Sequence, residues 1–135
     1  MVIRSLLAIL TAAGLAGCVH SFILSPKLPI TVDGPLEAPR IRFHADLLGQ
    51  PCISSLGMHD QTDRASGAVW GTGTPGLDCL HIPEMIYGQP PAGFVTRIGP
   101  RPLKPGVVYV IAAGGPVTYG GRRFAYDGGR WRAVE

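Results

Sequence analysis

The segment 122–134 constrains the fold of this sequence more than any other stretch. Apolar and polar residues alternate on both sides of Gly128-Gly129, and adjacent glycines suit a two-residue hairpin loop because positive φ costs glycine little. A loop of this length sets one register: Asp127 with Arg130, Tyr126 with Trp131, Ala125 with Arg132 and Phe124 with Ala133. That register predicts a hairpin whose apolar residues share one face: Phe124, Tyr126, Trp131 and Ala133.

The opposite face of the predicted hairpin is basic. It carries Arg123, Arg130 and Arg132, with only Asp127 to offset them. Arginine makes bidentate contacts with phosphate and carboxylate groups, so this face is a candidate binding surface for an anionic partner. The alternative is that these arginines keep an exposed hairpin soluble and block the pairing of its edge with other strands.

The rest of the sequence favours short strands joined by turns. The chain has 19 glycines and 13 prolines, only 16% of its residues are charged, and no convincing amphipathic helix follows residue 17. Strand-like patterns recur along the chain, at 28–33, 40–48, 52–56, 65–70, 77–82, 94–98, 107–113 and 116–119. We therefore expect an all-β fold, either a small antiparallel sandwich or a partly open barrel.

Three segments are expected to lie outside strands. The polar run 59–63 predicts an exposed loop, and the glycine-rich run 71–76 predicts a turn, since it lacks the lysine and the following helix of a phosphate loop. The proline-containing segment 83–92 predicts an extended loop with a short helical turn over 84–87. The apolar run 107–113, in contrast, is typical of a central strand buried on both faces.

The run Leu103-x-Pro105-Gly106-x-x-Tyr109 resembles the start of a late strand in immunoglobulin-like and fibronectin-like sandwiches. In those folds a tyrosine folds back onto the preceding turn. The resemblance implies that the expected sandwich is immunoglobulin-like. The spacing from Cys52 to Cys79 is much shorter than that of antibody domains, so the strand topology stays open.

The first 18 residues have the layout of an export signal. Arg4 precedes an apolar run that is too short to cross a bilayer, and small residues lead to a cysteine. Leu15-Ala16-Gly17-Cys18 resembles the lipobox of bacterial lipoproteins. This resemblance implies that the chain is cut before Cys18 and that Cys18 carries lipid chains, which together would hold the protein at a membrane. The alternative is an ordinary cleaved signal that leaves Cys18 as a free thiol.

The lipoprotein resemblance also implies a location. Position 19 is Val, whereas Asp there favours retention at the inner membrane in Gram-negative lipoproteins, so we expect an outer-membrane protein that faces the periplasm. The expected organisation is a removed signal peptide (1–17), a lipidated N-terminus and tether (18–29) and a single β domain (30–135). Removing the signal leaves 135 − 17 = 118 residues with 11 basic and 9 acidic side chains. The resulting balance of +2 gives no argument for nucleic acid as a partner.

Two cysteines remain once Cys18 is assigned to lipid. In an oxidising compartment Cys52 and Cys79 have a single intramolecular pairing, so we predict a disulfide between them. The alternative is a metal site formed by the two cysteines with His81 and His59. The spacing Cys79-x-His81 is not that of usual zinc sites, so we expect neither a metal nor another cofactor.

No catalytic constellation is recognisable in the sequence. Ser54, Ser55, His59, Asp60 and Asp63 lie close together, but none of them sits in a nucleophile elbow. We therefore expect a non-enzymatic, lipid-anchored envelope protein that serves an envelope assembly as an accessory or structural component through a protein partner. The first alternative is a module that binds an anionic envelope ligand, lipid phosphate or peptidoglycan, through Arg123, Arg130 and Arg132. An inhibitor of a cell-wall lytic enzyme is a further alternative, but its positive charge counts against it because many such enzymes are basic.

Overall fold

A computed structural model describes residues 27–45 and 49–135, so the predictions for the signal segment and for Cys18 lie outside the described residues. The described part is all-β and has no α-helix; its one helical turn is the 3-10 helix η1 (Arg64–Ser66). The strands are β1 (Ile30–Asp33), β2 (Arg40–Phe43), β3 (Cys52–Ile53), β4 (Ser55–Asp60), β5 (Ala68–Gly73), β6 (Leu80–His81), β7 (Glu84–Ile86), β8 (Val95–Ile98), β9 (Val108–Gly114), β10 (Tyr119–Asp127) and β11 (Arg130–Val134). Residues 27–45 and 49–135 contain no helix long and apolar enough to span a bilayer.

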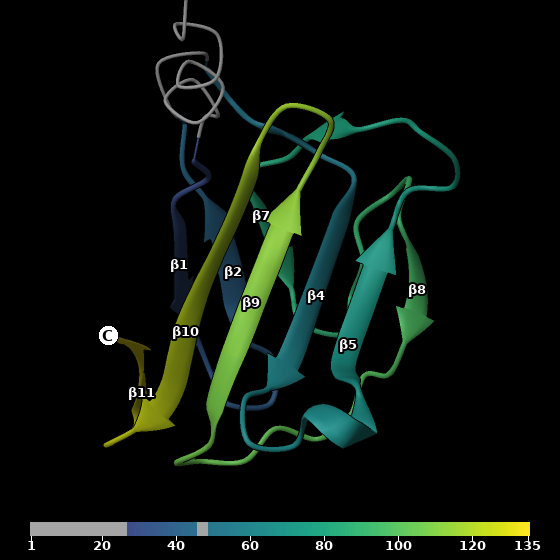
Figure 1. Cartoon of the computed structure of the whole chain (residues 1–135). Helices are drawn as coiled ribbons and strands as arrows, with labels where there is room; N and C mark the ends of the chain where they lie inside the picture. Colours follow the sequence, from purple (N-terminus) through teal and green to yellow (C-terminus); the bar gives the residue numbers. More distant parts are fainter. Residues whose placement is uncertain (1–26, 46–48) are drawn as a thin grey trace, which may run out of the picture.

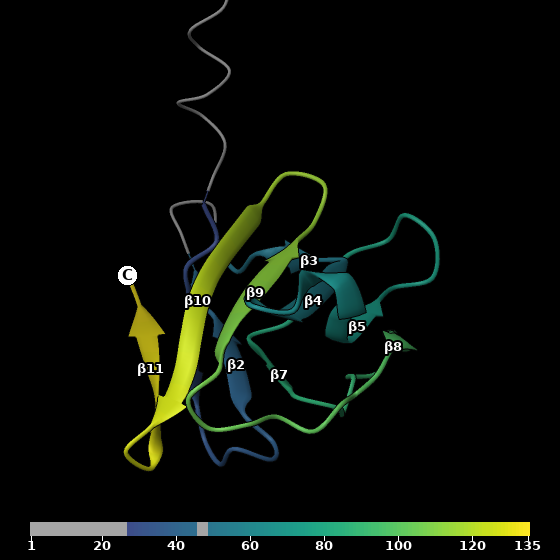
Figure 2. The same ribbon diagram turned by 60° about the horizontal axis from the view of Figure 1, so that its bottom comes forward.

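The strands form two main antiparallel sheets that pack face to face. The larger sheet has six strands in the order β11-β10-β9-β4-β5-β8, and the smaller one has the order β1-β2-β7. Figure 1 shows the six-stranded sheet in front and the three-stranded sheet behind it. Figure 2 shows β11 and β8 at opposite edges of the molecule. The sheets do not close into a barrel, so the sandwich is the predicted form that the fold takes.

A single hydrophobic core lies between the two sheets. Alternate residues of the inner strands point into it, which is why β9 and β4 read as alternating patterns in burial. The six-stranded sheet contributes Leu56, Met58, Trp70, Tyr109, Ile111, Ala113, Phe124 and Trp131, and the three-stranded sheet contributes Ile30, Ile41, Phe43 and Met85. The Trp70 and Tyr87 rings meet edge to face, with their centroids 5.2 Å apart.

The hairpin β10–β11 has the register that the sequence predicts. Asp127 pairs with Arg130, Tyr126 with Trp131, Ala125 with Arg132 and Phe124 with Ala133. Gly128 and Gly129 both take positive φ, as a two-residue loop requires. Trp131 is buried and its ring packs against those of Tyr126 and Tyr109, whereas Ala133, at the outer end of the hairpin, is exposed.

The predicted turn at Gly71–Gly76 is wrong in its first half. Gly71 and Gly73 belong to β5, and the chain turns only after them. The physical reason is close packing across strands, because a Cβ on Gly71 would lie 3.5 Å from the Ile98 side chain of β8. At Gly73 an added Cβ would lie 3.2 Å from Nε of Arg97. Glycine here permits close approach within a strand and does not mark a turn.

Two further sequence expectations are corrected. The helical turn predicted at 84–87 is instead strand β7, because these residues pair with β2 and bury Met85. The polar run 59–63 begins inside β4, which continues through Asp60 because it pairs with β9 along its whole length.

Strand β9 is central but is not buried on both faces. Tyr109, Ile111 and Ala113 are buried on the inner face, while Val108, Val110 and Ala112 are half-buried on the outer face. The second layer of the sandwich covers only the inner face. The apolar run in the sequence therefore predicted more burial for this strand than the structure shows.

Tyr109 folds back onto the turn before β9. Its hydroxyl oxygen accepts a hydrogen bond from the backbone N–H of Lys104 at 2.8 Å, which confirms the fold-back that the sequence resemblance implied. The division into six and three strands differs from the four and three strands of the constant-type immunoglobulin sandwich. The resemblance thus holds for this corner and not for the strand topology.

Candidate functional site

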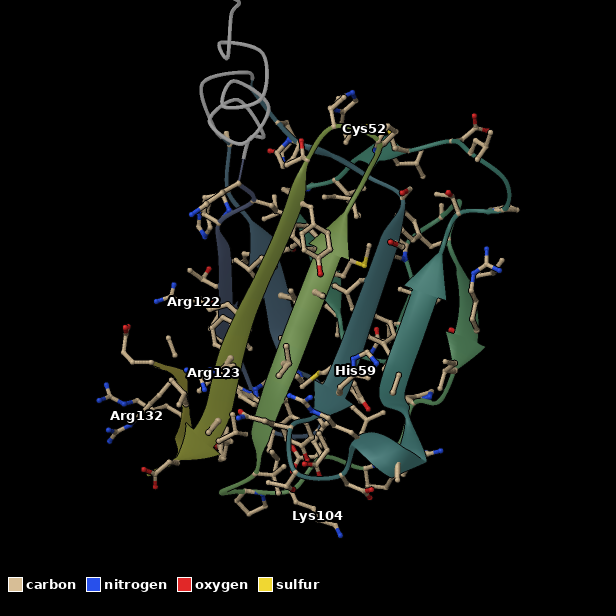
Figure 3. All side chains as sticks on the ribbon, in the orientation of Figure 1. Cys52, His59, Lys104, Arg122, Arg123 and Arg132 are labelled. Atoms are coloured by element: carbon tan, nitrogen blue, oxygen red, sulfur yellow. A yellow bond between two sulfur atoms is a disulfide. The ribbon has the colours of Figure 1, made fainter. Side chains whose placement is uncertain are left out.

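The three arginines of the candidate anion-binding face lie on one face of the hairpin. Arg123 is opposite Val134 in the register, Arg130 is opposite Asp127, and Arg132 is opposite Ala125. Arg130 and Arg132 are exposed and Arg123 is half-buried. Figure 3 shows Arg122, Arg123 and Arg132 on the hairpin side of the molecule.

Arg122 is a basic residue of this region that the sequence reasoning missed. It points away from Arg123 in the strand alternation, and its guanidinium lies over the Phe124 ring, 5.9 Å from the centroid. Arg122 and Arg123 nevertheless line one open pocket of about 360 Å³ together with Val110, Gly121, Val134 and Glu135. The doubled arginine in the sequence was the signal that could have found it.

The arginines of the hairpin have no acidic partner within the described residues. The ion pairs found there join Arg40 and Arg42 to Asp33 and Glu84 on the outside of the three-stranded sheet. Although Asp127 stands opposite Arg130 in the register, the two side chains form no ion pair. The positive charge of the hairpin arginines is therefore not neutralised by ion pairs within the described part of the protein, and it is available to an external anionic group.

The candidate nucleophiles and bases are not brought together into a catalytic unit. Ser55 and His59 share the outer face of β4, but they are four positions apart along the strand, which is about 13 Å. The His59 ring instead lies over Gly57, where an added Cβ would be 3.4 Å from Cε1. Ser54 donates its hydroxyl hydrogen to the Gly114 carbonyl at 3.2 Å.

The two carboxylates of this region stabilise their own turns. Asp60 accepts hydrogen bonds from the Thr62 hydroxyl at 2.7 Å and from the Thr62 N–H at 2.9 Å, and these bonds lower the pKa of Asp60. Asp63 accepts from the Ser66 N–H at 3.3 Å, at the start of η1. Each carboxylate is thus engaged locally, and within the described residues neither accepts a hydrogen bond from a serine hydroxyl or a histidine ring, as a general base would.

Asp60 and Asp63 also border an open pocket of about 300 Å³ at the end of the molecule where Figure 3 shows Lys104. Arg101 and Tyr109 line the same pocket, but both are held by backbone groups. Arg101 donates to the Ser66 carbonyl at 3.0 Å, and Tyr109 accepts from the Lys104 N–H. Burial raises the pKa of the Tyr109 hydroxyl.

The predicted disulfide between Cys52 and Cys79 is present. It joins the strand pair β3–β6 with a Cα–Cα distance of 5.2 Å. Both sulfurs are bonded to each other, so the alternative of a metal held by these cysteines with His81 and His59 is wrong. His81 Nδ1 instead lies 2.8 Å from the Gln50 carbonyl oxygen. Across residues 27–45 and 49–135 no group of three His, Cys, Asp or Glu side chains is placed to hold a metal ion.

The outer face of the six-stranded sheet is a surface that the sequence reasoning did not identify. One row across it consists of residues with little or no side chain, Gly121, Ala112, Gly57 and Gly71, and ends at Ile98 on β8. Val108 and Val110 lie on the same face and are half-buried. Glycines at alternate positions within strand patterns were the signal for this flat face. We call these residues, with Ser55 and Val95, the open sheet face.

Comparison with protein-family models, with curated proteins and with solved structures finds no match for this chain.

Proposed function

We propose that this protein is a lipid-anchored, periplasmic protein of the outer membrane that acts without catalysis, as an accessory or structural component of an envelope assembly. The lipobox-like Leu15-Ala16-Gly17-Cys18 supports the anchor. The Cys52–Cys79 disulfide supports an oxidising compartment, because such bonds persist in secreted and periplasmic proteins and are rare in the cytosol.

The observation that carries the accessory role is the chemistry of the open sheet face. An antiparallel sheet with one solvated face normally alternates apolar residues inside with polar residues outside. On β9 the outward residues are the half-buried Val108, Val110 and Ala112 and the buried Gly114, so this alternation fails along a central strand of the sheet. Apolar and small residues that stay accessible in the middle of a sheet favour contact with a protein partner.

The flatness of the open sheet face favours a broad contact over a small-molecule site. Its middle row has no side chain larger than a methyl group between β10 and β5. The pocket beside Arg122 and Arg123 overlaps the β10 side of this face, where Val110 and Gly121 line it, and the pocket beside Asp60 and Asp63 lies at the end of β4. A partner could therefore approach the backbone closely at Ala112 of β9 and Gly121 of β10, while on β4 the His59 ring lies over Gly57.

In-cell photo-cross-linking tests the accessory role. A photoreactive residue at Ser55, which is exposed on the open sheet face, should capture one envelope protein in near-stoichiometric yield. The same residue at Arg64, which is exposed on η1 beyond the other end of β4, is the matched control. Ala112→Arg should abolish capture from Ser55, because Ala112 is half-buried on this face and the neighbouring Gly121 is exposed and has no side chain to oppose the new one. Equal capture from Ser55 and Arg64 would contradict the role.

The second candidate function is binding of an anionic envelope ligand through Arg123, Arg130 and Arg132. The observation that favours it is the lack of acidic partners for these arginines within the described residues. Binding to purified peptidoglycan or to phosphatidylglycerol vesicles should then weaken steeply as salt rises. Replacing the three arginines with glutamine should remove the binding, whereas Arg64→Gln should not. Binding that is insensitive to salt would count against this candidate.

A further inference from the structure

The three most exposed of the large hydrophobic side chains lie toward one end of the sandwich. Leu77 is 95% exposed, Tyr119 68% and Val117 67%. Val117 lies in the β9–β10 turn and Tyr119 follows it at the start of β10, while Leu77 lies in the β5–β6 loop. Figure 1 shows this turn and this loop at the upper end of the molecule. We call Leu77, Val117 and Tyr119 the apolar rim.

The members of the apolar rim are held at the same end by the disulfide. Cys79, two residues after Leu77, is bonded to Cys52. An added Cβ on Gly115, at the start of the β9–β10 turn, would lie 3.7 Å from Cβ of Cys79. Val95 and Tyr119 also belong to the same end row of the six-stranded sheet, which runs through Gly114, Ser55 and Gly73.

The chain enters the domain at this end. The Leu28 N–H donates a hydrogen bond to the Tyr119 carbonyl at 3.2 Å, and the backbone of Lys27 forms an isolated parallel β-bridge with that of Tyr119. Cys18 precedes Lys27 by 27 − 18 = 9 residues, and such a length of chain spans at most about 32 Å when fully extended. A lipid on Cys18 would therefore keep the apolar rim within reach of the bilayer surface.

We infer that the apolar rim docks on the surface of the phospholipid bilayer that holds the lipid anchor; this inference rests on the lipid anchor of the proposed function. Tyrosine suits this contact because its ring is apolar and its hydroxyl finds water or headgroups at the interface. The charged groups beside the rim are mixed in sign, with Lys27 basic and Asp78 acidic. The contact is thus chiefly apolar and does not require anionic lipid.

Docking by the rim fixes which ligand the hairpin arginines can reach. The strands of the six-stranded sheet run away from the rim (Figure 1), and Asp127 lies eight residues along β10 from Tyr119, which is about 27 Å. Arg130 pairs with Asp127 at this far end. The arginines would then face the periplasm, where peptidoglycan carboxylates lie, and not the phosphates of the same bilayer.

A tryptophan reporter tests the docking. The native Trp70 and Trp131 are buried, so a new exposed tryptophan gives a separable signal over the parent protein. The full chain is isolated from cell membranes, its acylation is verified by mass, and it is reconstituted in phosphatidylethanolamine–phosphatidylglycerol vesicles that contain brominated lipid. Fluorescence of the Val117→Trp reporter should be quenched by at least half. An Arg64→Trp reporter, which is exposed on η1 away from the rim, is the control and should keep its fluorescence.

The vesicle experiment separates failure of docking from failure of the anchor. An acylated, vesicle-bound protein whose two reporters are quenched equally, or not at all, would overturn the docking and leave the anchor standing. A protein that carries no lipid and stays free of vesicles would overturn both. Adding Leu77→Glu and Tyr119→Gln to the Val117→Trp variant should remove most of the quenching. Unchanged quenching in that variant would show that tryptophan itself, and not the rim, enters the bilayer.

Discussion

Gly115 is one of the residues where a single added carbon should matter strongly for folding. A Cβ at this position would overlap the Cys52 carbonyl oxygen. We expect Gly115→Ala to lower the free energy of unfolding by roughly 2–3 kcal/mol, because the backbone carrying the disulfide would have to shift. Gly121→Ala is the matched control in the next strand, since its Cβ would meet nothing closer than 3.6 Å and alanine restricts the unfolded chain. Urea unfolding measures both, and similar midpoints for the two variants would contradict this expectation.

Tyr87 gives the protein a dependence on alkaline pH. Burial raises the pKa of its hydroxyl to about 12, because the charged phenolate loses its hydration in the interior. The hydroxyl donates a hydrogen bond to the Arg101 carbonyl at 2.6 Å and also lies 3.2 Å from the Val69 carbonyl. The folded state therefore holds its proton more tightly than the unfolded state. The stability from this group is complete below about pH 10 and is lost as pH rises toward 12.

The Tyr87→Phe variant isolates this contribution. Near neutral pH it should be less stable than the parent because it loses the hydrogen bond to Arg101. The difference in the free energy of unfolding should shrink by about 2–3 kcal/mol between pH 10 and pH 12, where Tyr87 ionises only on unfolding. Tyr109, whose pKa is also raised, is present in both proteins and cancels in the difference. A pH-independent difference would contradict the prediction.

At the scale of elements, the hairpin β10–β11 shows what sequence can predict. Its register follows from Gly128-Gly129 and from a local alternation, and both act within a dozen residues. The course of β5 and β7 could not be predicted in this way. Gly71 and Gly73 stay in β5 because side chains of β8 approach them, and β7 is a strand because β2 pairs with it. These are contacts between segments far apart in sequence, which local patterns do not contain.

The features of the candidate site also differ in whether local sequence patterns predict them. Two features of the candidate site were predictable. Strand alternation places Arg123, Arg130 and Arg132 on one face. Cys52 and Cys79 are the two cysteines left for pairing in an oxidising compartment once Cys18 is assigned to lipid. The open sheet face and the apolar rim were not predictable. Both are formed by strands and turns that come together only through the order β10-β9-β4-β5-β8.

The disulfide stabilises the small element β3–β6, which has only two residues in each strand. It closes a loop with a sequence separation of 27 residues, and the chain-entropy model then gives about 3.5 kcal/mol. Replacing both cysteines with alanine should lower the free energy of unfolding by an amount of this order, measured with urea. A double variant with the parent's midpoint would show that the loop is already ordered when unfolded.

At the scale of the whole molecule, the three candidate contact surfaces lie on different parts of the domain. The apolar rim lies at the end where the chain enters, the open sheet face covers one side, and the arginine hairpin extends along the edge toward the far end (Figures 1 and 3). Anchoring at Cys18 would bring the rim to the membrane. It would leave the hairpin arginines, and the part of the open sheet face beyond the row that Tyr119 shares with Ser55, for partners in the periplasm. This division lets one small domain contact a bilayer and an envelope partner at the same time.

The most direct test of the lipid anchor is the mass of the N-terminal peptide of the protein isolated from outer-membrane fractions of cells that produce it. Anchoring predicts a peptide that begins at Cys18 and carries a diacylglyceryl group on its sulfur, with a further acyl chain on its amino group. A soluble periplasmic protein whose Cys18 is unmodified, or has been removed with the signal, would contradict the anchor and the bilayer docking that depends on it.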